Sequence, residues 1–187
     1  MPGPTSDGTQ PVKPVSVSVR RTGRRFDAAA AFDTAASVDL VWKTLTDYPR
    51  LPDFMPGIRA CEIVQRKRLG PGREQLQVQQ RGEFRFLLFA QTLTVHLDIL
   101  HERHRSALAR ATRFDLGLIK DRALESFEGC YELQPVDDVV RVSYRAVIVS
   151  RLPPPPGIGT AAVRANLAGQ LNAVAGEIER RRSPART

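Results

Sequence analysis

Alternation between apolar and polar side chains runs through residues 58–149 and constrains the fold of this chain more than any other feature. Successive side chains of a β-strand point to opposite faces, so a period of two predicts half-buried strands rather than helices. Turn-forming residues such as Gly70, Pro71 and Gly72 separate the candidate strands. The strands are predicted at 59–67, 74–80, 88–100, 106–115, 124–133 and 139–149. Because the connections between them are short, we expect an antiparallel meander.

One long amphipathic helix follows the predicted sheet. Leu152 and the four prolines after it interrupt the last strand, and residues 160–182 then carry apolar side chains at helical spacing. The apolar stripe consists of Val163, Leu167, Leu171, Val174 and Ile178. Since this is the one long helix available to cover the sheet, we expect the twisted sheet to curl round it.

A short helix and a proline-rich strap precede the alternating region. A strand is predicted at 26–32, and Ser37 is a suitable N-cap for the helix that follows. The apolar face of that helix consists of Val38, Val41, Trp42 and Leu45. Residues 47–57, DYPRLPDFMPG, end the helix because Pro49 and Pro52 cannot continue it, yet they remain hydrophobic. The fold class is therefore α+β, with a curved antiparallel sheet of about seven strands, a long C-terminal helix and a strap at one end of the core.

The net charge of +8 is concentrated at the two ends of the chain. Residues 1–25 carry a net charge of +4 and residues 178–187 a net charge of +3, which leaves +1 for residues 26–177. We interpret 1–25 and 183–187 as disordered basic tails that flank a single domain at 26–182. Peripheral contact of these tails with an acidic membrane or with the ribosome is an alternative interpretation. The nearly neutral body gives no reason to expect specific DNA binding.

No stretch approaches the roughly 20 apolar residues that cross a bilayer. The pairs Arg20-Arg21 and Arg24-Arg25 resemble part of a twin-arginine export signal, but Asp27 interrupts the segment that follows them. We therefore expect a cytoplasmic protein, with a membrane-peripheral location as the alternative, and a monomer or weak dimer.

Neither the cysteines nor the histidines predict a reactive centre. Cys61 and Cys130 each lie in a strand-like run, so we expect packed free thiols. His101 and His104 have a spacing that can chelate a metal, but their neighbours favour a solvated hairpin tip. We expect no metal and no cofactor.

Two blocks of sequence resemble the START-like or SRPBCC superfamily, and more narrowly its polyketide cyclase/dehydrase and coenzyme-Q-binding group. The first block is VWKTLTDY at 41–48 with LPDFMPG at 51–57, and the second is FEGCYELQP at 127–135. The family usually has a tryptophan where this chain has Tyr131. The likeness extends over residues 26–182.

This resemblance implies a helix-grip fold, in which the sheet and the long helix enclose a deep, mostly apolar cavity. Members of the superfamily bind lipids, quinones, polyketides or plant hormones. Some act as aromatase/cyclases, others are carriers or chaperones without chemistry of their own, and one bacterial relative affects ribosome assembly. The resemblance thus implies a fold more sharply than a function.

Polar side chains on otherwise apolar strand faces are candidate ligand contacts. Gln80, Gln91, Arg110 and Tyr144 each share a predicted face with apolar neighbours, and an inward polar group needs a hydrogen-bond partner. A slip of one residue in the assignment of faces would reverse each of these directions. The full set of candidate ligand-binding residues is Tyr48, Phe54, Met55, Gln80, Gln91, Arg110, Tyr131, Tyr144, Leu167 and Leu171.

Three functions fit these features, and we favour the first. It is non-catalytic binding of a hydrophobic small molecule, such as an isoprenoid quinone, a lipid or a polyketide, in an internal cavity. The second is a polyketide cyclase/dehydratase, in which Arg110, Tyr131 or Tyr144 would supply acid–base catalysis. The third is an interaction protein of the ribosome or of a membrane surface that uses the basic ends. The sequence assigns no catalytic residue.

Overall fold

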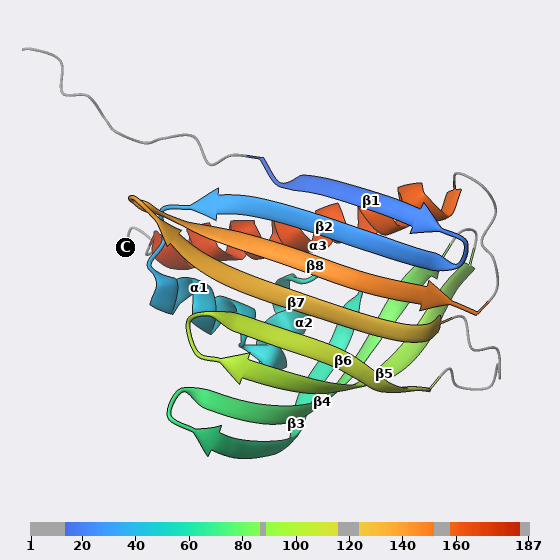
Figure 1. Cartoon of the computed structure of the whole chain (residues 1–187), viewed down its shortest axis with the longest axis horizontal. Helices are drawn as coiled ribbons and strands as arrows, with labels where there is room; N and C mark the ends of the chain where they lie inside the picture. Colours follow the sequence, from blue (N-terminus) through green and yellow to red (C-terminus); the bar gives the residue numbers. More distant parts are fainter. Residues whose placement is uncertain (1–13, 87–88, 116–123, 152–157, 184–187) are drawn as a thin grey trace, which may run out of the picture.

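The computed structural model describes residues 14–86, 89–115, 124–151 and 158–183, with the main chain alone at 84–86, 89–91 and 158. The strands are β1 (Ser16–Thr22), β2 (Arg25–Thr34), β3 (Ile58–Gly70), β4 (Arg73–Phe86), β5 (Phe89–Glu102), β6 (Ser106–Asp115), β7 (Leu124–Val136) and β8 (Val139–Ser150). The helices are α1 (Val38–Leu45), the 3-10 turn η1 (Tyr48–Arg50), α2 (Leu51–Phe54) and α3 (Ile158–Arg182). The strands form one antiparallel sheet in the order β1-β2-β8-β7-β6-β5-β4-β3, and α3 runs behind its β1–β2 half in Figure 1.

The predicted strands and helices are confirmed, and the predicted faces hold along most of them. In β5 the side chains of Leu93, Val95, Leu97 and Ile99 are buried, while those between them are half-buried or exposed. The predicted stripe of α3 faces the core, where all but Val163 are buried. Ser37 caps α1, since its side chain accepts a hydrogen bond of 3.3 Å from the N–H of Leu40. The architecture is the helix grip.

The prediction that residues 1–25 are wholly disordered is wrong, because they contain β1. β1 pairs with β2 along its whole length and raises the number of described strands to eight. Val17 and Val19 are half-buried against the core, whereas Ser16 and Ser18 are exposed on the outer face. Burial of these valines, together with main-chain pairing, offsets the entropy lost when the segment becomes ordered. The parts of the predicted tails at 1–13 and 184–187 lie outside the described residues.

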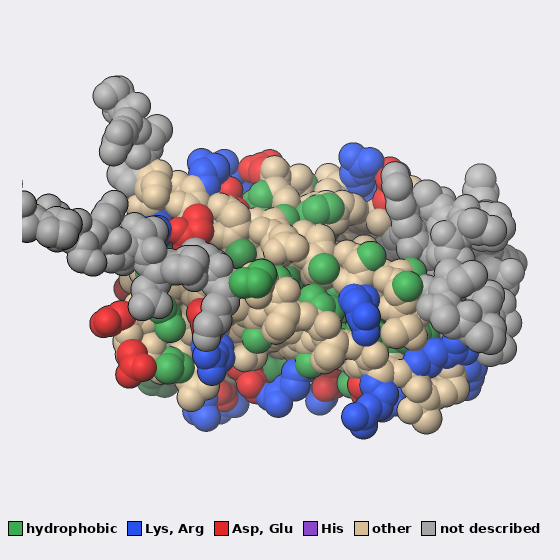
Figure 2. Space-filling model, turned by 90° about the horizontal axis from the view of Figure 1, so that it is seen from above, with side chains coloured by type: hydrophobic (Ala, Val, Ile, Leu, Met, Phe, Trp, Pro, Cys, Tyr) green, Lys and Arg blue, Asp and Glu red, His purple; other side chains and the backbone are tan. Residues whose placement is uncertain are grey.

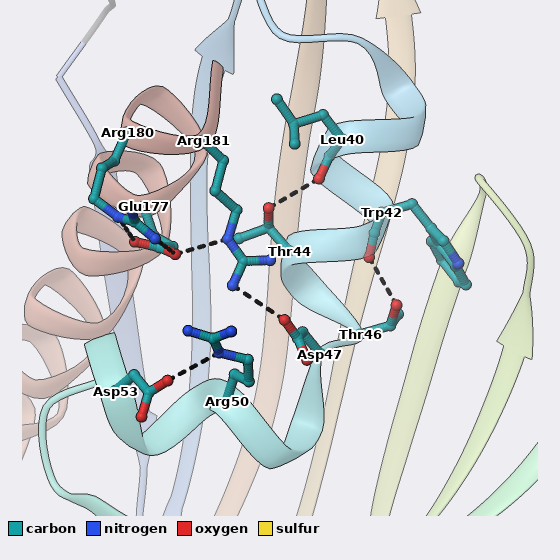
Figure 3. A network of polar contacts seen from close by, with 10 residues as sticks. All are labelled: Leu40, Trp42, Thr44, Thr46, Asp47, Arg50, Asp53, Glu177, Arg180 and Arg181. Atoms are coloured by element: carbon teal, nitrogen blue, oxygen red, sulfur yellow. Dashed lines mark hydrogen bonds and ion pairs between the residues drawn. The ribbon is translucent and has the colours of Figure 1, made fainter. Parts of the chain in front are cut away.

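The C-terminal arginines are likewise structured, and they hold the proline-rich strap against α3 (Figure 3). Arg181 donates from Nε to Glu177 Oε1 at 2.7 Å and contacts Asp47 Oδ2 of the strap through Nη2 at 3.1 Å. Its guanidinium carbon also lies 5.7 Å from the ring centroid of Phe54. Hydrogen bonds from Arg180 and Arg181 lower the pKa of Glu177 to about 2. The positive charge of Arg180, Arg181 and Arg182 therefore belongs to the folded domain, in ion pairs with Glu177, Glu179 and Asp47.

The long helix covers only part of the concave face. α3 packs mainly on β1, β2 and α1, with smaller contacts to β4 and α2, while η1 and α2 of the strap pack on β3. Among the described residues, none of the helices combines the length and the apolar character that a membrane-spanning helix requires.

Candidate ligand-binding site

The inward side chains of the sheet are more deeply buried on β2 than on β6, β7 and β8. Every inward side chain from Phe26 to Phe32 of β2 is buried beneath α3. On β6, β7 and β8, by contrast, several inward side chains keep accessible surface although they pack against the core. These half-buried residues are Ala109, Ala111, Phe127, Tyr131, Tyr144 and Ile148. The accessible part of the interior therefore lies on the middle strands.

A row of small residues crosses these strands in register. Ala28 of β2 pairs with Ala146 of β8, which pairs with Gly129 of β7. Gly129 in turn pairs with Ala109 of β6. Side chains of directly opposite residues lie on the same face, so the four form one continuous line on the concave side. We call these four residues the small-residue row. Small side chains let neighbouring groups come close to the sheet, and Ala28, Ala146 and Gly129 are buried beneath such groups, whereas Ala109 keeps accessible surface.

Tyr131 and Tyr144 flank the small-residue row on one side. They are opposite each other on β7 and β8, with ring centroids 4.5 Å apart and an angle of 43° between the rings. Tyr144 leans over Gly129, where a Cβ atom would lie only 2.6 Å from its Oη. Glycine at 129 thus gives the phenol access to the row. On the other side of the row lie Phe127 and Ile148, also opposite each other.

Both phenols are neutral at physiological pH and are available for hydrogen bonding. Burial, with the neighbouring Tyr144 and Tyr48, raises the pKa of Tyr131 well above its ordinary value, and burial with Cys130 raises that of Tyr144. Among the described residues neither hydroxyl has a hydrogen-bond partner, and neither is a fully buried unsatisfied atom. Both hydroxyls are therefore accessible within the interior, where each can donate to or accept from a ligand oxygen.

A second polar group lies further along the same face, where the strap meets β5. Tyr48 Oη and His101 Nε2 are 2.7 Å apart, and His101 Nδ1 is 3.1 Å from Glu74 Oε1. A carboxylate only accepts, so Nδ1 carries the proton and Nε2 accepts from Tyr48. Burial lowers the pKa of His101, although the Glu74 contact raises it. Burial, then Cys61 and Glu74, raises the pKa of Tyr48.

This contact corrects the expectation of a solvated histidine pair. His101 is only 2% exposed and belongs to the interior, with the Trp42 ring edge-on at 5.1 Å between centroids. His104 does lie in the turn, where its Nε2 is 2.7 Å from Asp39 Oδ1 of α1. No local pattern predicts the Tyr48 contact, because the two residues are 53 positions apart in the sequence. Among the described residues, no group of three or more His, Cys, Asp or Glu side chains could hold a metal ion.

Arg110 points outward, which contradicts its predicted place among the ligand contacts. Its side chain is 64% exposed and its Nε donates to Glu128 Oε2 at 2.6 Å. The prediction assumed that every second residue before Phe114 lies on the same face as Phe114, and Phe114 itself does face the core. A β-bulge intervenes, because Leu97 pairs with Ala111 but His96 pairs with Arg113. The extra residue shifts the phase by one, so Ala109 and Ala111 face inward.

The other candidate residues occupy varied positions. Tyr48, Met55, Leu167 and Leu171 are buried in the core, whereas Phe54 and Gln80 are half-buried. Gln80 lies opposite Val95 and Cys61 on the inner face, as predicted. The side chain of Gln91 lies outside the described residues. Whether a ligand contacts these residues stays a prediction.

Both cysteines are free thiols, as expected. Cys61 is buried on the inner face, and burial raises its pKa to about 12. Cys130 is half-buried, next to the inward Tyr131 and therefore on the outer face, and burial raises its pKa as well. Raised pKa values keep both thiols protonated, which does not favour nucleophilic chemistry.

The outer face carries a shallow depression of about 390 Å³ along β1, β2 and β8. Its outward-facing lining residues are Ser16, Ser18, Ala29, Ala31, Glu132, Ser143 and Arg145. Figure 2, which looks down from above, shows uncharged side chains, several of them hydrophobic, in the middle and charges of both signs mostly along the margins. Ser16 and Ser18 donate to carbonyls of β2, and Arg145 pairs with Glu132, so most of these polar groups are already engaged. The inner face is therefore the better candidate site.

Three solved structures show the same fold as this chain. A START superfamily protein from Mycobacterium smegmatis has a TM-score of 0.67 at 16% identity, covering 82% of this chain and 97% of that one. The Zhui aromatase/cyclase from a Streptomyces species has a TM-score of 0.64 at 22% identity, covering 87% of this chain and 98% of that one. A STAR-related lipid transfer protein from Xanthomonas axonopodis has a TM-score of 0.62 at 16% identity, with 91% and 97% covered.

Sequence comparison gives the family. No curated protein matches the chain significantly. The model of the family described as polyketide cyclase / dehydrase and lipid transport matches residues 34–174, which include α1, the strap and the whole of β3–β8. Because this match covers more than half of the chain, the chain belongs to the family described as polyketide cyclase / dehydrase and lipid transport.

Proposed function

We propose that this chain binds a hydrophobic small molecule over the small-residue row, between the middle strands and α3. The observation that carries the proposal is the pair of phenol hydroxyls, of Tyr131 and Tyr144, which lie on a mostly apolar part of the inner face and have no hydrogen-bond partner among the described residues. Apolar burial at about 25 cal/mol per Å² would supply the affinity. The two hydroxyls would orient the ligand through a carbonyl or hydroxyl oxygen. An isoprenoid quinone, a lipid and an aromatic polyketide all combine an apolar body with such an oxygen.

The two phenols allow a direct test. Replacing both in the Tyr131→Phe/Tyr144→Phe variant removes two ligand hydrogen bonds, each worth about 0.5–1.5 kcal/mol, so affinity falls by about tenfold to a hundredfold. Stability changes little, because neither hydroxyl bonds to a described residue. Isothermal titration with ubiquinone analogues, fatty acids and aromatic polyketides measures the affinity.

Tyr48→Phe is the matched control, since its hydroxyl already bonds to His101. We expect this variant to lose stability and, because the Tyr48 hydroxyl is engaged with His101, to lose less affinity than the double variant. Unchanged affinity in the double variant, for every ligand that the wild type binds, would contradict the proposed orientation.

Cyclase or dehydratase activity is the second candidate, and the neutral phenol of Tyr144 favours it. A phenol that stays protonated can donate a hydrogen bond to the oxygen on which negative charge develops in a folded substrate, although its raised pKa makes it a weak proton donor. Arg110, the third residue considered for this role, is excluded by its place on the outer face. Tyr144→Phe should then reduce turnover of a reactive polyketide far more than it reduces binding. Equal losses in both would favour a carrier.

Contact of the basic ends with a ribosome or membrane remains a third prediction. Its test has to spare β1 and Arg180–Arg182, which belong to the folded domain. Deletion of residues 1–13 and 184–187 should abolish co-sedimentation if those ends carry the contact.

A further inference from the structure

Two neighbouring hairpin turns form a surface that the ligand site does not use. We define this hairpin-tip surface as residues 64–74, which contain the β3–β4 turn, and residues 102–105, which contain the β5–β6 turn. The two turns are joined by a hydrogen bond of 2.8 Å from the N–H of Arg103 to the carbonyl of Gly72. Both lie at the end of the molecule that also carries α1 (Figure 1). Every residue from Val64 to Gly70 is exposed, so this part of β3 extends beyond the core.

Positive charge is concentrated on this surface. It carries six cations, Arg66, Lys67, Arg68, Arg73, Arg103 and Arg105, against the two carboxylates of Glu74 and Glu102. Its net charge is +4, whereas the whole of residues 26–177 has +1, so the rest of that body is net negative. The carboxylates face Arg66, Arg73 and Arg105 at 3.6–3.9 Å. Among the described residues, Lys67 and Arg68 form no ion pair.

The same surface carries the two large apolar side chains that are exposed among the described residues. Val64 is 62% exposed and Leu69 is 44% exposed, and no other large hydrophobic residue described is exposed. Each is the extra residue of a β-bulge, since the pairing of β3 with β4 skips from Ile63 to Gln65 and from Arg68 to Gly70. Bulges re-aim side chains, and here they place both apolar groups in solvent among the cations.

We propose that the hairpin-tip surface docks on an anionic lipid bilayer. Clustered Lys and Arg side chains are attracted to the negative surface of such a bilayer, and neighbouring apolar side chains enter the interface between headgroups and acyl chains. Single-stranded RNA is a poorer fit, because binding without base readout relies on aromatic side chains for stacking. The ring available in these turns belongs to His104, which Asp39 already holds. This inference goes beyond the proposed ligand binding and does not rest on it.

Vesicle co-sedimentation of the full chain tests the docking. The probes are vesicles of phosphatidylcholine alone and of phosphatidylcholine mixed with phosphatidylserine. We expect binding to the mixed vesicles only, weakened by added salt. Charge reversal in Lys67→Glu/Arg68→Glu should weaken the binding by at least about tenfold. Leu69→Ser should weaken it too, with the salt dependence unchanged.

Arg20→Glu/Arg164→Glu is the matched control, because it makes the same change of net charge on exposed residues of β1 and α3. It should bind the mixed vesicles as the wild type does. Equal losses in the two double variants would overturn the proposal, because net charge alone would then explain the binding. Binding to polyuridylate that depends on Lys67 and Arg68, without binding to vesicles, would also overturn it and assign the surface to RNA.

Discussion

Gly129 has no side chain at the point where Tyr144 needs space, which makes it a sensitive position of the inner face. A Cβ atom there would lie 2.6 Å from Tyr144 Oη and 3.0 Å from Phe127 Cζ. Gly129→Ala should therefore displace both rings and reduce the free energy of unfolding by about 1–3 kcal/mol, the usual cost of overpacking. Urea denaturation measures this loss.

Gly169→Ala is the control for that substitution. Gly169 is exposed on α3 and a Cβ atom there meets nothing within 4 Å. Because alanine is the better helix former, this variant should gain about 0.5–1 kcal/mol. If Gly129→Ala is as stable as the wild type, Tyr144 does not depend on the space above Gly129.

His101 should make stability depend on pH. Burial lowers its pKa below the ordinary 6.5, so the unfolded chain binds this proton at a higher pH than the folded chain does. The contribution of neutral His101 to the free energy of unfolding is therefore complete above pH 6.5. It is lost as the pH falls toward the lower pKa of the folded state, by at most about 1.4 kcal/mol per pH unit. His101→Gln should flatten this slope between about pH 7.5 and 5.5 in urea denaturation. His96→Gln, on the outer face, should keep it.

The direction of single side chains could be predicted from alternation at some positions and not at others. The inward direction of Gln80 and Tyr144 follows from alternation alone, and the structure agrees. Arg110 was misplaced because a bulge in β6 shifts the phase, and no residue type marks that bulge. The burial of His101 depends on Tyr48, a contact that only the folded chain creates.

At the scale of elements, the attachment of the strap to α3 depends on one arginine. Arg181 is largely buried and its planar fork reaches both Glu177 and Asp47. Lysine cannot bridge these two carboxylates in the same way, so Arg181→Lys should cost about 1–2 kcal/mol of stability. Arg182→Lys, in a more exposed pair with Glu179, should cost less than about 0.5 kcal/mol.

Hydrogen exchange reports on the same attachment. We expect faster exchange of the Met55 amide, which bonds to the Leu51 carbonyl within the strap, in Arg181→Lys than in Arg182→Lys. Similar exchange in both variants would mean that packing on β3, rather than Arg181, holds the strap.

Most elements were predictable because their signals are local. The stripe of α3 and the cap of α1 depend on spacing within one segment, and both are confirmed. β1 was missed although Val17 and Val19 alternate with serines, because the surrounding proline, serine and arginine residues suggested a tail. A polar edge strand has a weaker pattern than a central one, since only one side of it is paired and few of its side chains are buried.

For the whole molecule, family membership and the helix grip define where a ligand would lie but not which ligand it is. The small-residue row and the phenols are on the concave side, whereas the hairpin-tip surface is at the end of the sheet. Their separation means that ligand binding and docking can be disrupted independently. The small-residue row was not predicted, because its members become neighbours only through the register of four strands.

Native mass spectrometry of protein purified gently from its own organism tests the central claim most directly. We predict that the wild type carries an organic ligand. Ala109→Leu, which adds bulk at the accessible end of the row, should carry none, and Ala29→Leu on the exposed outer face should retain it. Repeated spectra of apo wild-type protein that also takes up no quinone, lipid or polyketide would contradict the claim. An unchanged ligand load in Ala109→Leu would place the binding site elsewhere.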